Sequence, residues 1–178
     1  PTPPYDATER RLPVIAPADA PQRFAALYAP NEQERAEADL SDVFEFVPVP
    51  AEPVRIGPFE VQAVPVAHLC ESWGFRVAAE GKVLAYTGDT GPCPQLADLA
   101  ADADVLLSEA SWTDFPDAPE GVHLSGRQAA EVAKTAAARR LLLTHLVPWT
   151  DGDAILAEAQ AVFDGPVERV VADRTYDV

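Results

Sequence analysis

The residues best suited to catalysis or metal binding in this chain are its three histidines. His68, His123 and His145 each lie at the end of an expected strand or in a turn. Strand ends that pass into exposed loops are where α/β proteins build their sites, because the strand holds the side chain rigidly. A single histidine in such a place is more often a hydrogen-bonded structural residue than a metal ligand. Three histidines in similar positions favour one shared site.

A carboxylate flanked by glycines lies between His68 and His145 in the sequence. Residues 86–91 read Tyr-Thr-Gly-Asp-Thr-Gly, so an apolar strand ends near Asp89. Glycine lets the backbone approach a bound ion, and a carboxylate oxygen is a hard ligand that is able to bridge two cations. A type I turn without any metal explains the same residues. Asp89 is therefore a candidate ligand only in combination with the histidines.

His123, Leu124 and Ser125 come directly before an alanine-rich segment that predicts a helix over 126–139. Ser125 is the expected N-cap of that helix. Because helix N-termini bind anions, the functional interpretation of His123 is a proton donor or a phosphate contact, and Ser125 is a candidate substrate-binding residue. The alternative is that His123 caps the helix or lies on the surface.

Two tryptophans and two cysteines lie near these motifs. Trp112 and Trp149 each follow a motif strand, and an aromatic face there could stack on a nucleobase. Core packing is favoured for both, although Trp112 is kept as a candidate substrate contact. Cys70 and Cys93 are expected to be small, buried, reduced side chains, since their spacing fits neither a disulfide framework nor a C-x-x-C site.

The elements that must position these residues follow a clear order. Apolar runs and breakers predict strands at 12–16, within 44–67, at 73–79 and 82–86 (a hairpin), 105–107, 141–143 and 167–172, and helices at 94–101, 126–139 and 153–163, with two short helices between 19 and 39. A meander of strands over 44–67 thus precedes alternating strands and helices. This order predicts an α/β fold with sheets covered by helices, in one domain over 1–178.

The charge of the chain limits its partners. It carries 29 acidic and 13 basic residues, a net charge of −16, which repels extended nucleic acid. No apolar run approaches the roughly 18 residues of a membrane span, and the Pro-Thr-Pro-Pro start lacks the basic and apolar regions of a signal peptide. We expect a soluble, cytoplasmic protein with no membrane partner; a homodimer stays open.

The order of the motifs resembles the later half of the metallo-β-lactamase superfamily, in the branch that contains tRNase Z and the cyclic-nucleotide phosphodiesterases. Segments 108–113, 123–126, 141–145, 148–150 and 163–167 look like the atypical class II cyclic-AMP phosphodiesterases of actinobacteria, and the likeness extends over 12–178. The resemblance implies an αβ/βα sandwich with a dinuclear metal site, here lacking its amino-terminal part.

Roles follow from the resemblance residue by residue. His68 looks like a ligand of the first metal, His145 a ligand of the second, and Asp89 the carboxylate that bridges both, so the predicted catalytic residues are Asp89 and His123. Two divalent ions, zinc or manganese, are implied. The family's H-x-H-x-D-H motif, which supplies four further ligands, is absent from the sequence, and we expect it upstream of Pro1. These 178 residues alone are expected to bind metal poorly and to be inactive.

The resulting functional hypothesis is hydrolysis of 3′,5′-cyclic AMP to the 5′-monophosphate. Two metal ions make a hydroxide available near neutral pH for in-line attack on phosphorus, and His123 protonates the leaving 3′ oxygen. The partner is then a small cyclic nucleotide rather than a nucleic acid. The alternatives are RNA 3′ processing of the tRNase Z kind, which needs a basic patch to hold RNA, and a metal-free form without activity.

Overall fold

The computed structural model describes residues 11–178, which form two compact units, one up to Pro50 and one from Ala51 to Val178. The prediction of a single domain over 1–178 stays a prediction. In the first unit, β1 (Leu12–Ala16) and β2 (Phe44–Pro48) form a parallel pair. They are connected by α1 (Ala20–Tyr28) and α2 (Glu32–Glu37), so the two expected short helices are confirmed.

The pairing of β2 differs from the expected meander over 44–67. β2 pairs with β1 in parallel and belongs to a different unit from β3 and β4. A parallel pair requires a crossover between its strands, and the two helices provide one. Phe24 from α1 covers the pair, because its ring centroid lies 5.3 Å from that of Phe44 and 5.2 Å from that of Phe46.

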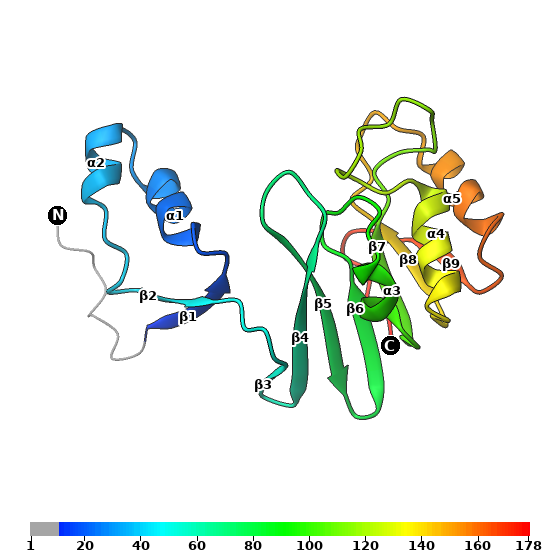
Figure 1. Ribbon diagram of the computed structural model, residues 1–178, viewed down its shortest axis with the longest axis horizontal. Helices are drawn as coiled ribbons and strands as arrows, with labels where there is room; N and C mark the ends of the chain where they lie inside the picture. The colour runs from blue at the N-terminus through cyan, green and yellow to red at the C-terminus, as the bar shows by residue number, and fades with distance from the viewer. Residues whose placement is uncertain (1–10) are drawn as a thin grey trace. The chain divides into compact units, whose positions relative to one another are not determined.

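The second unit contains a seven-stranded mixed sheet (Figure 1). Its strands, in both spatial and chain order, are β3 (Val54–Ile56), β4 (Phe59–Val66), β5 (Ser72–Ala79), β6 (Lys82–Tyr86), β7 (Val105–Glu109), β8 (Leu141–Thr144) and β9 (Val167–Arg169). Pairing is antiparallel from β3 to β6 and parallel from β6 to β9. The predicted hairpin is β5–β6, and its turn is Glu80-Gly81, both with positive φ.

The strand directions bring four chain segments to one edge of this sheet. Because two antiparallel steps separate β4 from β6, these two strands run in the same direction, and β7 and β8 run parallel to β6. The carboxyl ends of all four strands therefore lie at the same edge. The residues that follow these ends include His68, Asp89 and His145, and Glu109 is the last residue of β7.

Three helices cover one face of the sheet: α3 (Gln95–Ala100), α4 (Gly126–Thr135) and α5 (Gly152–Gln160) (Figure 1). Leu141 and Leu143 of β8 point to this face and are fully buried with Leu106, Leu99 and Ile155. Alternation along the strand turns Leu142 to the other face, where it lines a pocket together with residues near the carboxyl terminus. None of the helices within residues 11–178 has the length and hydrophobicity needed to cross a bilayer.

The alanine-rich helix ends at Thr135, earlier than its predicted end at residue 139. Ala137 adopts a left-handed conformation with φ 53°, and the amide of Ala138 donates to the carbonyl of Ala133 at 2.9 Å. This is a Schellman-type stop, which usually has glycine at the left-handed position. An alanine there gives the sequence no visible stop signal. The last helix and the last strand are likewise shorter than expected, ending at Gln160 and Arg169.

Candidate active site

The structure brings the three histidines and Asp89 together at the sheet edge. The ring centroid of His123 lies 5.3 Å from that of His68 and 5.1 Å from that of His145. Nδ1 of His145 lies 3.6 Å from Oδ1 of Asp89. These four residues come from three strand ends and one loop that are separated by up to 77 positions in the sequence. The fold thus gathers the residues that were predicted to act together.

The glycines around Asp89 are required by close contacts. Gly88 has φ 64°, and a Cβ there would lie 2.4 Å from the carbonyl oxygen of Trp73. A Cβ on Gly91 would lie 2.5 Å from the backbone of Gly121. Any larger residue at either position would push the loop away from its neighbours. The loop is thereby fixed, and its carboxylate at Asp89 stays half-exposed next to the histidines.

Two of the histidines use Nδ1 to bond to an oxygen of the protein. In His68, Nδ1 is 2.8 Å from the carbonyl oxygen of Val122, and in His123 it is 2.9 Å from Oε1 of Glu109. Both partners only accept hydrogen bonds, so we assign the proton to Nδ1 in each ring. Nε2 then keeps its lone pair in the neutral ring. This is the arrangement that a protein uses to orient a histidine for metal binding or proton transfer.

Nδ1 of His145 is also hydrogen-bonded to the protein, in this case to the hydroxyl of Ser111. Nδ1 of His145 lies 3.0 Å from the Ser111 hydroxyl, which also lies 3.0 Å from Oε2 of Glu109. The hydroxyl has one proton, and the carboxylate is its strongest acceptor, so Ser111 donates to Glu109 and accepts from Nδ1–H. His145 itself has φ 54°, a strained conformation for a residue other than glycine, and such strain often marks a functional position.

Glu109 is the residue that the sequence reasoning missed. It is fully buried and accepts from four donors: the amides of Thr90 (2.6 Å) and Leu124 (3.2 Å), the Ser111 hydroxyl (3.0 Å) and Nδ1–H of His123 (2.9 Å). Within residues 11–178, no lysine or arginine pairs with it. The available signal was a carboxylate at the end of an apolar strand, the same pattern that pointed to Asp89.

Glu109, His123 and His145 also place one potential ligand atom each within 4.8 Å of one another. We do not assign these three as the metal ligands, because the four donors already occupy the oxygens of Glu109 and because His123 uses Nδ1 to reach it. The predicted donor set is His68, Asp89 and His145. Among residues 11–178, neither Nε2 atom of this set has a hydrogen-bond partner, and the carboxylate is half-exposed. Their role as ligands stays a prediction.

The predictions for Trp112, Trp149 and Ser125 have different outcomes. Trp112 is half-buried, and its ring meets that of His123 edge-on at 5.1 Å, so it packs within the site. Trp149 is 86% exposed, and the expectation of core packing for it was wrong. Ser125 is buried and completes the predicted cap, since its hydroxyl accepts from the amide of Gln128 at 3.2 Å while the Gln128 side chain accepts from the amide of Ser125. That cap accounts for the Ser125 hydroxyl, and the predicted substrate contact stays a prediction.

The cysteines are free thiols, as expected, but Cys70 is exposed rather than buried. Its neighbours Leu69 and Glu71 in the loop after β4 are exposed too. Cys93 is half-buried, with its sulfur 3.8 Å from the Thr90 hydroxyl.

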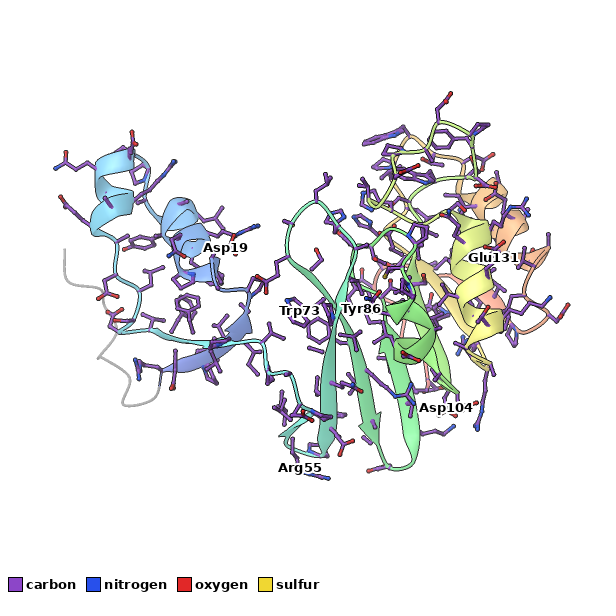
Figure 2. The ribbon with its side chains drawn as sticks, in the orientation of Figure 1. Asp19, Arg55, Trp73, Tyr86, Asp104 and Glu131 are labelled. Carbon is purple, nitrogen blue, oxygen red and sulfur yellow. The ribbon has the colours of Figure 1, made fainter. Side chains whose placement is uncertain are left out.

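Tyr86 adds a neutral phenol near the site. It ends β6, where it pairs with Phe75 of β5 (Tyr86 is labelled in Figure 2). Burial, followed by the negative charges of Asp89 and Glu109, raises the pKa of its hydroxyl. Tyr86 therefore stays protonated at neutral pH and adds no charge to an edge that is already acidic.

Comparison with known proteins decides the family. Residues 4–146 match the family described as the Beta-lactamase superfamily domain. The chain belongs to this superfamily. The crystal structure of the metallo-beta-lactamase fold protein YhfI from Bacillus subtilis superposes on it with a TM-score of 0.75 at 24% identity, covering 90% of this chain and 63% of YhfI. The predicted α/β class and metallo-β-lactamase fold are confirmed, and hydrolase activity and metal binding stay predictions.

Sequence relatives extend this assignment. Rv1339 of Mycobacterium tuberculosis is 45% identical over 167 residues, which is 93% of this chain and 60% of Rv1339. Ribonuclease Z of Myxococcus xanthus is 45% identical over 92 residues, which is 49% of this chain and 30% of that enzyme. The chain thus spans 50% to 60% of the length of the mycobacterial relatives that it matches. Assignment to the cyclic-AMP phosphodiesterase branch stays a prediction.

Proposed function

We propose that this superfamily member is a phosphodiesterase that hydrolyses 3′,5′-cyclic AMP, and that the chain supplies its proton donor and three of its metal ligands. The supporting observation is the row of three histidines, each with Nδ1 bonded to the protein, beside the Asp89 carboxylate. Two free Nε2 atoms and one carboxylate are fewer than two metal sites require. The proposal therefore includes further ligands from outside these 178 residues.

Two divalent ions, zinc or manganese, would supply a nucleophile derived from water and offset the charge of the phosphoryl oxygens. The residues to hold them are His68 and His145 through Nε2 and Asp89 through its carboxylate. The hydrogen bonds to Val122 and Ser111 keep both rings in the required tautomer before any ion arrives. This preorganisation is the contribution of the fold.

His123 is the residue to protonate the leaving oxygen. In its doubly protonated form, His123 donates Nδ1–H to Glu109 and has Nε2–H free. The buried Glu109 carboxylate stabilises the positive ring, as an orienting carboxylate does in other acid–base pairs. When the ester bond breaks, the proton on Nε2 moves to the leaving 3′ oxygen and the ring becomes neutral. His123 keeps its Nδ1 proton and its orientation throughout.

The charge of the chain supports a small substrate. A cyclic nucleotide brings one negative charge, which ions at the site can offset locally, whereas a polynucleotide extends its phosphates over the acidic surface of a chain with net charge −16. The second candidate is RNA 3′ processing, which the similarity to ribonuclease Z favours. The two candidates share the metal ligands and differ in what lies around them.

The test offers cyclic AMP and a tRNA precursor to the full-length protein with zinc or manganese. We expect AMP release and little RNA cleavage. His123→Ala should lower the rate of AMP release by roughly 10²–10⁴ with unchanged metal content. The same variant should change much less with methyl p-nitrophenyl phosphate, since its leaving group departs as a stable anion without a proton.

The outcomes separate the candidates. RNA cleavage with inert cyclic AMP would transfer the assignment to RNA processing. A full-length protein that binds metal but cleaves no phosphodiester would contradict both. An equal loss with the two small substrates on His123→Ala would remove His123 from proton donation.

A further inference from the structure

A separate pocket of about 360 Å³ opens beside His123. One wall is the loop at Ala118, Pro119 and Glu120, and the other includes Pro92 and Gln128 of α4. His123 lines the pocket while its ring also contacts His68 and His145. A group in this pocket would therefore lie on the side of the site where His123 acts.

The lining of the pocket suits a neutral organic group. Among the described residues that form it, none is lysine or arginine, and the only ionisable groups are Glu120 and His123. The prolines and Ala118 offer apolar surface. A second phosphate here would meet the Glu120 carboxylate and no lysine or arginine, which disfavours an additional anionic group.

Gln128, which lines this pocket and a neighbouring one, has a side-chain amide of fixed orientation. Its Oε1 accepts from the amide of Ser125 at 2.9 Å, which is half of the capping box of α4. The amide nitrogen Nε2 must then point the other way, and residues 11–178 provide no acceptor for it. Small-ligand pockets typically combine apolar walls with a few such polar groups.

We propose that this pocket binds the neutral, acceptor-bearing group attached to the leaving oxygen of the phosphodiester, with Nε2 of Gln128 as the donor. The inference rests on the proposed function. The volume of the pocket lies near the lower end of the roughly 300–1,000 Å³ that is typical of small-ligand pockets, so the pocket accepts one nucleoside. In a cyclic nucleotide the leaving oxygen belongs to a nucleoside without a second phosphate. In RNA, the nucleoside next to the broken bond carries another phosphate, and the lining of this pocket disfavours that additional negative charge.

Two variants of the full-length, metal-loaded protein test the pocket. Ala118→Phe fills it from the half-buried loop wall. Gln128→Glu keeps an oxygen for the Ser125 amide, and so keeps the capping box, but removes the Nε2 donor and adds a negative charge. Glu131→Gln is the control, because Glu131 lies one turn further along α4, is exposed and does not line this pocket.

The measurements are the KM for cyclic AMP and the Kd for adenosine, a neutral nucleoside that needs no turnover. Each pocket variant should raise both by roughly tenfold, while the control stays within about twofold of the parent. Urea unfolding of the variants checks that the fold is kept.

The two proposals fail in different ways. Cyclic AMP hydrolysis with KM and adenosine affinity unchanged in both variants would overturn the pocket assignment. Adenosine binding that is weakened by both variants, in a protein that hydrolyses no phosphodiester, would support the pocket and contradict the proposed function.

Discussion

Replacing Glu109 with glutamine should destabilise the protein by an amount that follows from the four hydrogen bonds of this residue. Glutamine has one oxygen and one NH₂ group where glutamate has two acceptor oxygens. If the NH₂ replaces Oε1 while His123 keeps its proton on Nδ1, the Thr90 amide and Nδ1–H of His123 both lose their acceptor. Each buried donor without a partner costs about 1–3 kcal/mol, so this orientation loses about 2–6 kcal/mol.

The opposite orientation costs less and should be the one adopted. With NH₂ at the Oε2 position, the Ser111 hydroxyl turns to accept from it and donates instead to the carbonyl oxygen of His145, 3.1 Å away. Only the Leu124 amide then lacks an acceptor. We expect Glu109→Gln to lower the free energy of unfolding by about 1–3 kcal/mol.

The assay is urea unfolding followed by tryptophan fluorescence. All three tryptophans of the chain lie in the unit 51–178, so the signal reports on the unit that contains Glu109. The midpoint should fall by about 1 M urea at an m-value of roughly 1–3 kcal/mol/M. Glu131→Gln, on the exposed side of α4 (Figure 2), should stay within about 0.5 kcal/mol of the parent. Equal midpoints for the two variants would refute the hydrogen-bond account of Glu109.

Three further predictions follow from other contacts. The pKa of Asp104 is held below its usual range by a hydrogen bond from the Val83 amide, and further by Lys82 and Arg139. Asp104 therefore contributes stability that is present above about pH 4 and is lost as the pH falls further. The difference in urea midpoint between the parent and Asp104→Asn should shrink over that acid range, and a constant difference would contradict this. Gly88→Ala should destabilise more than Gly57→Ala in the same assay, since both glycines have positive φ but only at Gly88 would a Cβ meet a neighbour, at 2.4 Å; equal losses would contradict the packing argument. Asp89→Ala in the full-length protein should reduce metal content from two ions to one or fewer by atomic emission, and unchanged content would exclude a bridging carboxylate.

The sequence predicted the positions of His68, Asp89 and His145 well, because strand ends carry a strong signal. His68, Asp89 and His145 each follow an apolar run, and parallel strands bring such ends to one edge. Ser125 was recognisable as a cap from its side chain and the helix that follows. In each case local chemistry and the fold agree.

Other features depend on contacts that no local pattern shows. Glu109 has its role only because the loop 111–124 folds back and brings the Leu124 amide and His123 to its carboxylate. The early end of α4 depends on a left-handed alanine at Ala137, where the sequence has no glycine. The parallel pairing of β2 with β1 and the exposure of Trp149 also follow from the arrangement of distant segments.

The most direct test of the central claim is the ¹⁵N NMR spectrum of the histidine rings in the full-length protein, before and after zinc is added, with the signals assigned from single variants. The hydrogen bonds predict that all three rings of this chain carry a proton on Nδ1 when neutral. Zinc should then shift the Nε2 signals of His68 and His145 strongly and leave that of His123 nearly in place. A shift of His123 as large as those of the other two, or no shift at His68 and His145, would contradict the division of these histidines into metal ligands and proton donor.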